Sequence, residues 1–393
     1  MAEKKKVLFV IMSLDCGGAE KSLVSLLSLF DFDKYDVSLQ MFRDSGMFRS
    51  LLPDKVKVLP PFEYAEFCRK GGFRPRYMIR RAYVAAGIRW NKLTHKNKYH
   101  SAQVYWKYAG GAYPAAADPY DVAIAWGQGN PTHYVASKVH AGVKLAIINI
   151  DYRAAGYNPD FDRPYYQAID HIAGVSGRLY DSLVNVFPDM KEKLIVLWDI
   201  RNQSLIERMA DLPESDFVRA EDGFTLTTVG RMTRQKGYDI AVGAAAILKR
   251  HGRRFRWYLV GDGTEHPAIR EQIEREGLAD CVIDVGARPN PYPFVKGADI
   301  YVQTSRFEGF CLTLAEARIL GVPPVSTCFD VVYDQLRSGE NGLIADMTPE
   351  AVAAGIERLM DDPALYASVR DTLRREHIGN EDEILKLYRL MGE

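Results

Sequence analysis

The chain has 393 residues, enough for about two domains that each bury a core of their own. Apolar residues make up 47% and charged residues 26%, which excludes a disordered, collagenous or coiled-coil chain. The 51 basic and 51 acidic residues cancel, which argues against a protein that coats nucleic acid by bulk charge. Residues 1–200 nevertheless hold 27 basic and 20 acidic residues, and 201–393 hold the remaining 24 and 31. This asymmetry favours two domains with different partners.

The cysteines and the N-terminus indicate a cytoplasmic protein. The five cysteines are odd in number and form no Cys-x-x-Cys pair, so a disulfide framework or a structural zinc site is not expected. The basic start and the apolar run 7–12 superficially resemble a signal peptide, but the run is too short and is followed by Asp15 and two glycines. We interpret this run as a buried first strand. No apolar stretch approaches the ~20 residues of a membrane span.

The first half of the chain alternates short apolar runs with segments of helical periodicity. Between the first two runs, Leu23, Leu26, Leu27 and Phe30 recur at helical spacing. Strands that alternate with helices predict a parallel sheet with crossover helices. The expected strands are residues 7–12, 37–41, 56–59, 122–126, 145–150, 171–175 and 194–197.

A second alternating series follows residues 199–223, which are polar and acidic and are interpreted as a linker. Two such series predict an α/β protein with two doubly wound, Rossmann-like domains facing a cleft, residues 1–200 and 201–370. We expect a C-terminal helix in residues 371–393 to pack back on the first domain. The second series comprises strands 225–229, 257–260, 282–285, 300–303 and 322–326, helices 237–250, 267–276 and 312–320, and further helical patterns from 349 onward.

The segment between Glu66 and Asp118 has no acidic residue but has eleven basic ones, with aromatic residues interleaved. Such a run is often only a solvated face, and the same composition would also hold RNA phosphates and stack bases. Basic side chains attract anionic head groups and Trp and Tyr anchor at the interface, so we predict that residues 67–117 dock on an anionic membrane. A helix within 77–93 would carry Ile79, Tyr83, Ala86 and Trp90 on one face, flanked by Arg80, Arg81, Arg89 and Lys92.

Two basic residues, Arg231 and Lys236, lie between Gly230 and Gly237, where a predicted strand joins a predicted helix. In doubly wound folds, ligands bind at the carboxyl ends of strands. A glycine permits the tight turn, and an arginine and a lysine can clamp a diphosphate. The pattern predicts a phosphate site, although an ordinary turn with solvated cations fits it as well.

A second strand–helix junction covers residues 305–316. Glu308 lies in its loop, and Glu316 lies one to two turns into the helix. Carboxylates accept hydrogen bonds from hydroxyls, which suits sugar and ribose rings, but a capping or salt-bridged glutamate is the ordinary alternative for Glu316. At the helix N-terminus, phosphate oxygens would be held by the backbone N–H groups of Gly309, Phe310 and Cys311.

With Val-Gly-Asp-Gly at 260–263 and Gly-Val-Pro at 321–323, these stretches resemble glycosyltransferase family 4 in order and spacing over residues 225–361. That family comprises retaining enzymes of GT-B fold that use nucleotide-sugar donors. The resemblance implies a hexosyltransferase of bacterial cell-surface polysaccharide or glycolipid synthesis. Gly-Gly-Ala-Glu at 17–20 also looks like the family's glycine loop.

The resemblance implies a role for each site residue. Arg231 and Lys236 would bind the donor diphosphate, where fixed cations favour the charge that builds on the leaving phosphate. Glu308 would bind hydroxyls of the sugar, and Glu316 would bind the ribose. Because the cation pair does the work of a metal, the family is usually metal-independent, and we expect no cofactor. The remaining donor-binding residues would be Gly17, Gly18, Gly230, Gly261, Arg288, Gly309, Phe310, Cys311 and Leu312.

The first domain matches the family less well. Where relatives carry a histidine or an acidic residue, this chain has Gln128 and Asn149, which cannot act as bases, and Asp151, which could act as one or merely cap a turn. His133 is expected to be structural. The implied acceptor is a saccharide or a lipid-linked molecule at the inner face of the plasma membrane.

Two alternatives stay open. The first is a nucleotide-sugar epimerase or hydrolase built from two such domains, and the second is a non-catalytic protein that binds sugar nucleotides or RNA. The neutral net charge counts against a nucleic-acid partner.

Overall fold

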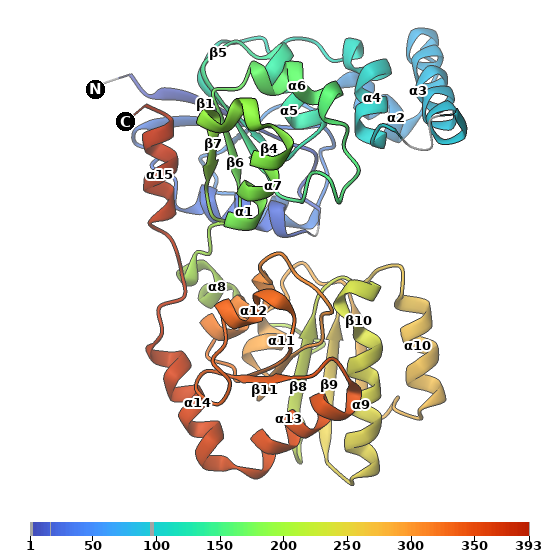
Figure 1. Cartoon of the computed structure of the whole chain (residues 1–393), viewed down its shortest axis with the longest axis vertical. Coiled ribbons are helices and arrows are strands. Elements are labelled where there is room, and N and C mark those ends of the chain that lie inside the picture. The colour runs from blue at the N-terminus through green and yellow to red at the C-terminus, as the bar shows by residue number, and fades with distance from the viewer. Residues whose placement is uncertain (1–2, 16, 95–97, 393) are drawn as a thin grey trace. The chain divides into compact units, whose positions relative to one another are not determined.

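The computed structural model describes residues 3–15, 17–94 and 98–392, so Cys16 and Lys96 lie outside the described residues. The chain forms two compact units (Figure 1). Unit 1 comprises Met1–Ile200 with Glu381–Glu393, and unit 2 comprises Arg201–Asn380. Each unit contains a parallel sheet flanked by helices, which confirms the predicted α/β class with two doubly wound parts.

The sheet of unit 1 has seven strands in the order β3-β2-β1-β4-β5-β6-β7. The order reverses between β1 and β4, which are neighbours in the sheet although two strands separate them in the chain. The strands are β1 (Lys5–Ile11), β2 (Tyr35–Met41), β3 (Lys57–Val58), β4 (Tyr120–Trp126), β5 (Ala141–Ile148), β6 (His171–Gly174) and β7 (Leu194–Val196).

Helices cover both faces of this sheet, so its strands are apolar on both sides. Along β1, Leu8 and Val10 enter one buried cluster, whereas Val7 and Phe9 enter the other. This arrangement explains why the predicted strands read as continuous apolar runs. The helices are α1 (Gly18–Ser28), α2 (Glu63–Lys70), α3 (Pro75–Thr94), α4 (Ser101–Ala109), α5 (Asn130–Lys138), α6 (Pro159–Gln167), α7 (Gly177–Val186) and α15 (Glu383–Leu390), with short 3₁₀ turns at Met47–Leu51, Gly110–Ala112 and Pro188–Lys193.

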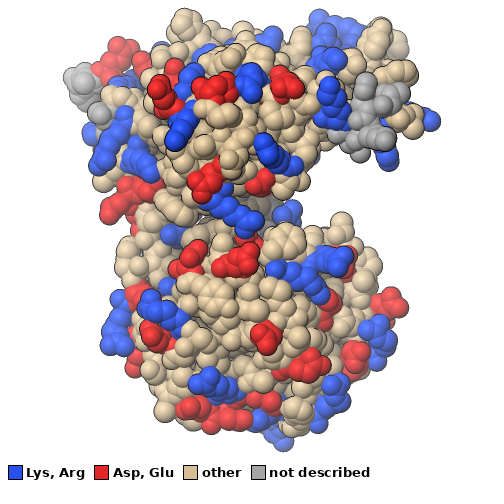
Figure 2. All heavy atoms as spheres, viewed as in Figure 1, with Lys and Arg blue, Asp and Glu red and all other residues tan. Residues whose placement is uncertain are grey.

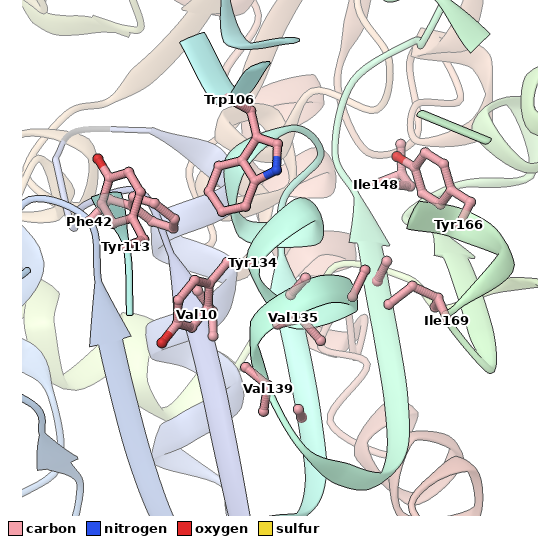
Figure 3. Close-up of a cluster of buried hydrophobic side chains, with 14 of the residues drawn as sticks. Val10, Phe42, Trp106, Tyr113, Tyr134, Val135, Val139, Ile148, Tyr166 and Ile169 are labelled. Carbon is pink, nitrogen blue, oxygen red and sulfur yellow. The ribbon is translucent and has the colours of Figure 1, made fainter. Parts of the chain in front are cut away.

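Aromatic side chains join α4 and α5 to the sheet of unit 1 (Figure 3). Trp106 of α4 stacks on Tyr113 with ring centroids 5.8 Å apart, and Tyr113 contacts Phe42 at 5.0 Å. Large buried rings of this kind contribute strongly to a core. They fix the position of α4, on which α3 packs.

Unit 2 has six strands in the order β10-β9-β8-β11-β12-β13, and its order reverses between β8 and β11. The strands are β8 (Phe224–Val229), β9 (Phe255–Val260), β10 (Val282–Gly286), β11 (Ile300–Gln303), β12 (Pro324–Thr327) and β13 (Leu343–Ala345). The helices are α8 (Gln203–Ala210), α9 (Tyr238–Arg250), α10 (His266–Arg275), α11 (Tyr292–Lys296), α12 (Leu312–Ile319), α13 (Pro349–Asp361) and α14 (Pro363–Arg375), with 3₁₀ turns at Arg234–Lys236 and Asp330–Asp334.

The segment 199–223, interpreted as a linker, contains helix α8 of unit 2. Asn202 caps this helix by accepting the N–H of Leu205 at 3.0 Å. Ile206 and Met209 are buried, so the helix is amphipathic and packs on its unit. The overall polarity of the segment concealed this narrow apolar face.

The chain returns to unit 1 at its C-terminus. Helix α14 extends to Arg375 within unit 2, beyond the expected boundary at residue 371, and the return begins at Glu381. In α15, Leu387 is fully buried, and the ring of Tyr388 stacks on Tyr35 with centroids 5.2 Å apart. These apolar contacts hold the last helix on unit 1.

Candidate functional site

The reversal of strand order in unit 2 brings two loops together, because β8 and β11 are neighbours whose connections run in opposite directions. Ligands of doubly wound sheets bind at such a reversal, outside the carboxyl ends of the strands. The loop 230–237 follows β8, and the loop 304–311 follows β11. These are the two stretches in which the sequence predicted a phosphate site and a sugar site.

Glycines allow the backbone segments at this edge to touch. A Cβ on Gly261, after β9, would overlap the carbonyl oxygen of Gly230, and one on Gly263 would overlap the backbone of Met232. The N–H of Gly261 donates to the carbonyl of Gly286 at 2.9 Å. The lack of a side chain at Gly261 therefore lets the loop after β9 touch the backbone of Gly230 in the loop after β8, while the role of both glycines in donor binding stays a prediction.

Gly237 fixes the loop after β8 against the loop after β11. Its φ of +63° lies in the left-handed region, and a Cβ there would overlap the carbonyl oxygen of Thr304. Arg306 also bridges the loops, because its two Nη atoms donate to both carboxylate oxygens of Asp239 at 2.8 and 2.6 Å. A bidentate pair of this kind fixes orientation as well as distance.

Lys236 and Glu308 form a buried ion pair at the centre of this junction. The Nζ of Lys236 lies 2.6 Å from Oε1 of Glu308, and the two side chains are only 15% and 6% exposed. Burial alone would lower the pKa of Lys236, but the attraction of Glu308 outweighs burial and raises that pKa, against the repulsion of Arg231. Lys236 is therefore a fixed cation at neutral pH.

A chain of hydrogen bonds that the sequence did not reveal holds Glu308. Ser305 donates to Oε1 of Glu308 at 2.6 Å, and Gln303 donates to Ser305 at 2.7 Å. Tyr301 and Thr313 both donate to Oε1 of Gln303, at 2.7 and 3.0 Å. The polar alternation 301, 303, 305 at the end of a buried strand was the available signal, because buried polar side chains need partners.

Arg231 presents its side chain to solvent at the same edge of the sheet. It follows Gly230, its side chain is exposed, and it makes no ion pair within the described part of the chain. Its charge acts on Lys236, as the effect on the pKa of that lysine indicates. The loop thus carries two cations, one fixed by Glu308 and one presented to solvent.

The turn before α12 has a strained backbone. Cys311 has a φ of +69° and is, among residues 3–15, 17–94 and 98–392, the only non-glycine with positive φ. Gln335 donates to the carbonyls of Phe310 and Cys311 and thereby holds the turn. Burial, followed by the charge of Glu308, raises the pKa of the Cys311 thiol to about 12, so the thiol is neutral.

Several backbone N–H groups of this turn have no acceptor among the described residues. Within the described residues, the N–H groups of Gly309, Cys311 and Leu312 donate to no protein atom. Unpaired N–H groups at a helix N-terminus attract anions, since the helix dipole adds to them. The predicted phosphate-binding backbone therefore lies beside the Lys236–Glu308 pair.

Glu316 is buried inside unit 2. Its side chain is 4% exposed, and Oε1 accepts a hydrogen bond from the Tyr292 hydroxyl of α11 at 3.0 Å. Burial, followed by the charge of Glu316, raises the pKa of Tyr292 well above 10, so the tyrosine remains a donor. This donor stabilises a carboxylate that would otherwise be costly to bury.

Arg288, predicted to contact the donor, is engaged elsewhere. Its guanidinium pairs with Asp216, in the segment before β8. The neighbouring Gly286 contributes only its carbonyl to the site, through the N–H of Gly261. Arg288 thus does not join the Lys236–Glu308 pair in this structure.

In unit 1, the predicted donor glycines open helix α1. Gly17 is its N-cap and Gly18 its first residue. A Cβ on Gly17 would overlap the carboxylate of Glu20, so the absence of a side chain lets that carboxylate lie over the helix start. The role of these glycines in donor binding stays a prediction.

Asp151 caps a turn. Its Oδ1 accepts the N–H of Ala154 at 2.8 Å. This hydrogen bond is the main reason why the pKa of Asp151 is lowered, and Ser182 and Arg178 add to the effect. A lowered pKa makes a carboxylate a weaker base, so the role as general base stays a prediction that the geometry does not favour.

His133 is buried in unit 1, as a structural residue would be. Its Nε2 lies 2.7 Å from Oδ1 of Asp162, and both side chains are 1% exposed. Tyr152 donates to the other oxygen of Asp162. Nearby, Gln128 accepts the N–H of Asn149 at 3.3 Å, which joins the loops after β4 and β5.

The described residues contain neither a cluster of metal ligands nor a helix suited to span a membrane. No group of three or more His, Cys, Asp or Glu side chains there has the geometry of a metal site. No helix there is both long and apolar enough to cross a membrane. Independence from metal stays a prediction.

Solved structures share the fold over nearly the whole chain. The Anabaena protein HepE in complex with UDP and glucose superposes with a TM-score of 0.67 at 17% identity, over 98% of both chains. TarM of S. aureus superposes with a TM-score of 0.67 at 14% identity, over 99% of this chain and 100% of that one. At such identities the likeness concerns the fold, and it confirms the predicted GT-B class.

Curated relatives match in sequence over part of their length. A D-inositol 3-phosphate glycosyltransferase of Acidothermus cellulolyticus is 34% identical over 43% of this chain and 41% of its own length. The lipopolysaccharide core biosynthesis glycosyltransferase LpsD of Rhizobium meliloti is 29% identical over 47% and 54%. The chain therefore spans about half the length of these relatives.

Residues 214–376, which contain the whole site of unit 2, match the family of glycosyl transferases group 1. Over these residues, which lie in unit 2, the chain is similar to the glycosyl transferases group 1 family.

Proposed function

We propose that the protein transfers a sugar from a nucleoside-diphosphate sugar to an acceptor hydroxyl, with retention of the anomeric configuration. The observation that carries this proposal is the preorganised junction after β8 and β11. There, a buried lysine–glutamate pair and an exposed arginine lie near backbone N–H groups that have no acceptor among the described residues. This set supplies positive charge for a diphosphate and carboxylate oxygen for hydroxyls.

Bond breaking determines what the cations must do. When the bond from C1 of the sugar to the phosphate oxygen breaks, its electron pair goes to that oxygen, and negative charge builds on the diphosphate. Arg231 and Lys236 favour this charge electrostatically, as do the N–H groups before α12. Because Glu308 already holds Lys236, little reorganisation is needed when the charge develops.

Retention follows from a departure and an attack on the same face of the sugar. The acceptor oxygen forms the new bond to C1, and its proton passes to the phosphate oxygen that leaves. This route needs no carboxylate nucleophile beneath the ring. Within the site, Glu308 is held by Lys236 and Ser305, which suits it to bind hydroxyls rather than to attack.

Names of similar proteins support a setting for the reaction. Relatives are named for lipopolysaccharide core, amylovoran and colanic acid biosynthesis. We therefore propose an acceptor that is a saccharide or lipid-linked saccharide of the bacterial cell surface. The reaction would take place in the cytoplasm, at the inner face of the plasma membrane.

A thermal-shift screen with UDP-, GDP- and ADP-sugars tests the donor site directly. A ligand at 100-fold its dissociation constant stabilises the protein by ~2.7 kcal/mol. UDP-sugars are the first to test, because HepE was solved with UDP-glucose and TarM with UDP. The proposal predicts a shift for one nucleotide class, and its loss in the Arg231→Ala variant. No shift with any nucleotide sugar would overturn it.

Product analysis separates transfer from the alternative reactions. Nuclear magnetic resonance of the product should show a new glycoside of unchanged anomeric configuration. Donor turnover without any acceptor, at the rate seen with acceptor, would instead indicate an epimerase or hydrolase. Inversion at C1 would overturn the retaining assignment.

A further inference from the structure

Helix α3 of unit 1 presents an apolar stripe to solvent. Ile79, Tyr83, Trp90 and Leu93 are 58%, 62%, 63% and 69% exposed. With Ala86 they recur at spacings of three and four residues, so they share one helix face. Soluble proteins rarely expose two aromatic and two large aliphatic side chains on one helix face.

The opposite face of α3 already has its packing partners. Tyr77 and Val84 are buried, and a Cβ on Gly87 would overlap the ring of Tyr108 in α4. Helix α4 is itself fixed by Trp106 in the core (Figure 3). The exposed stripe is therefore the outer face of a well-anchored helix, which Figure 1 shows at the periphery of unit 1.

The stripe lies in a positively charged setting. Helix α3 has no acidic residue, and its cations Arg81, Arg89 and Lys92 are exposed and form no ion pair within the described residues. The two acidic residues of α2 are engaged, since Glu63 pairs with Arg74 and Glu66 pairs with Arg69 and Lys70. In Figure 2, the part of α3 that grey atoms leave visible shows blue and tan atoms and no red ones.

We propose that the α3 stripe (Ile79, Tyr83, Ala86, Trp90 and Leu93) inserts into the interface of an anionic membrane, with Arg81, Arg89 and Lys92 on its head groups. Aromatic rings and aliphatic chains suit the boundary between head groups and acyl chains, and the cations suit anionic lipids. RNA would occupy the cations and stack on the rings, but it offers no apolar region for Ile79 and Leu93.

Docking would hold unit 1 at the surface where a lipid-linked acceptor resides. That consequence rests on the proposed function, whereas docking itself does not. Vesicle binding needs neither donor nor acceptor, and the nucleotide-sugar thermal shift needs no vesicle. Either proposal can therefore fail while the other stands.

The test is co-sedimentation of the full chain with vesicles of phosphatidylcholine alone or of equal parts phosphatidylcholine and phosphatidylglycerol. We expect at least ~10-fold tighter binding to the anionic vesicles, weakening as salt rises, because charge is screened over ~8–10 Å at physiological ionic strength. The triple variant R81E/R89E/K92E should lose at least ~100-fold in binding. Arg80 is left in place because it is half-buried against Gly111.

A second variant, Y83S/W90S/L93S, removes the apolar stripe and keeps every charge. It should lose at least ~10-fold in binding at both low and high salt. The matched control R254E/R275E/R374E reverses three exposed arginines of unit 2 and should bind as the parent does. Thermal unfolding of each variant checks that it is folded.

Three results would overturn the proposal. They are no binding to either vesicle, equal binding to both, and a serine variant that binds as the parent does. Tight, salt-dependent RNA binding that R81E/R89E/K92E abolishes, together with no vesicle binding, would assign the surface to RNA instead.

Discussion

Units 1 and 2 both contain a parallel sheet whose strand order reverses once, but the loops beyond their central strands differ in charge. In unit 2 these loops carry Arg231, Lys236 and Glu308, and the last two are buried against each other. In unit 1 the loops after β4 and β5 carry the amides Gln128 and Asn149, together with Asp151, whose carboxylate caps a turn. The same fold therefore holds a buried ion pair in one unit, and two amides and a turn-capping carboxylate at the loops after β4 and β5 in the other.

The two units differ in the hydrogen-bond partners that they provide for their buried polar side chains. Unit 2 surrounds the buried carboxylate of Glu308 with the donors Lys236 and Ser305. In unit 1, Oδ1 of Asn149 is buried and has no hydrogen-bond partner within the described residues. A buried ion needs a network of hydrogen-bond donors and opposite charges, because its charge is costly to remove from water. A buried amide carries no net charge and tolerates fewer hydrogen-bond partners. We therefore expect phosphate chemistry to depend on unit 2 and the neutral groups of unit 1 to face hydroxyls.

The largest expected effect tests the ionic side of this comparison. Replacement of Lys236 by Ala should lower turnover by at least ~10²-fold, because a fixed cation no longer stabilises the leaving phosphate. Replacement of Arg231 by Ala should act similarly. The measurement is turnover at saturating donor. Lys249→Ala, an exposed lysine of α9 paired with Asp280, is the control and should be unaffected. Parent-like transfer by both site variants would contradict the assignment.

Loss of Lys236 should also destabilise unit 2, since Glu308 would remain buried without its cation. We expect a decrease of about 3 kcal/mol in the free energy of unfolding. Lys236→Met combined with Glu308→Gln should recover part of this loss. A destabilised but active Lys236→Ala enzyme would give the pair a purely structural role.

A glycine in each unit provides a matched test of backbone strain. Gly237 and Gly156 both have positive φ, +63° and +78°, but only Gly237 has a neighbour, the carbonyl of Thr304, where a Cβ would lie. Gly156→Ala should cost about 1 kcal/mol, for conformation alone. Gly237→Ala should lower the free energy of unfolding by about 2 kcal/mol more than Gly156→Ala does, because its Cβ would overlap the carbonyl oxygen of Thr304. Chemical denaturation measures both changes. Equal losses of unfolding free energy in the two variants would show that the loops after β8 and β11 move apart at little cost.

The positioning of Glu308 is expected to have a smaller effect. Ser305→Ala removes the hydroxyl that donates to Glu308 and should lower kcat about 10-fold with little change in KM, because one hydrogen bond to a charged group is lost. Ser326→Ala in β12 removes a similarly buried hydroxyl that donates to the carbonyl of Thr327 instead of to Glu308 and is the control. A change of equal size in both variants would point to packing instead.

Asp151 should give the smallest effect if it is only a turn cap. Asp151→Asn keeps an oxygen for the N–H of Ala154 and should change turnover less than ~3-fold, whereas a general base would lose ~10²-fold or more. Asp151→Ala should lose about 1 kcal/mol of stability at pH 7.

The pH dependence of that stability has a definite sign. Because the folded pKa of Asp151 is lowered, its contribution is complete above the ordinary value of 3.8 and is lost as pH falls through the folded pKa. The parent and the Ala variant should therefore converge in strong acid. A gap between them that stays constant with pH would exclude the carboxylate as the cause.

Much of the fold could be read from local pattern. Continuous apolar runs such as 122–126 predicted parallel strands, since both faces of such a strand are buried. Helix α8 was missed because its few apolar residues lie in a polar segment, and only their contacts in unit 2 make it stable. The boundary of the C-terminal return moved from 371 to 381 because α14 keeps its buried Val369 and Leu373 in unit 2.

For the candidate site too, the sequence predicted some features, and others depend on the tertiary structure. Residue type and spacing were enough to select the junctions after β8 and β11, the pair of glutamates, and the amphipathic face of α3, because each is a property of neighbouring residues. The pairing of Lys236 with Glu308, across 72 positions, and the capture of Arg288 by Asp216 depend on loops from different strands. The positive φ of Cys311 likewise depends on Gln335, which holds its turn from afar. Such contacts arise only when the sheet brings distant segments to one edge, and no local pattern records them.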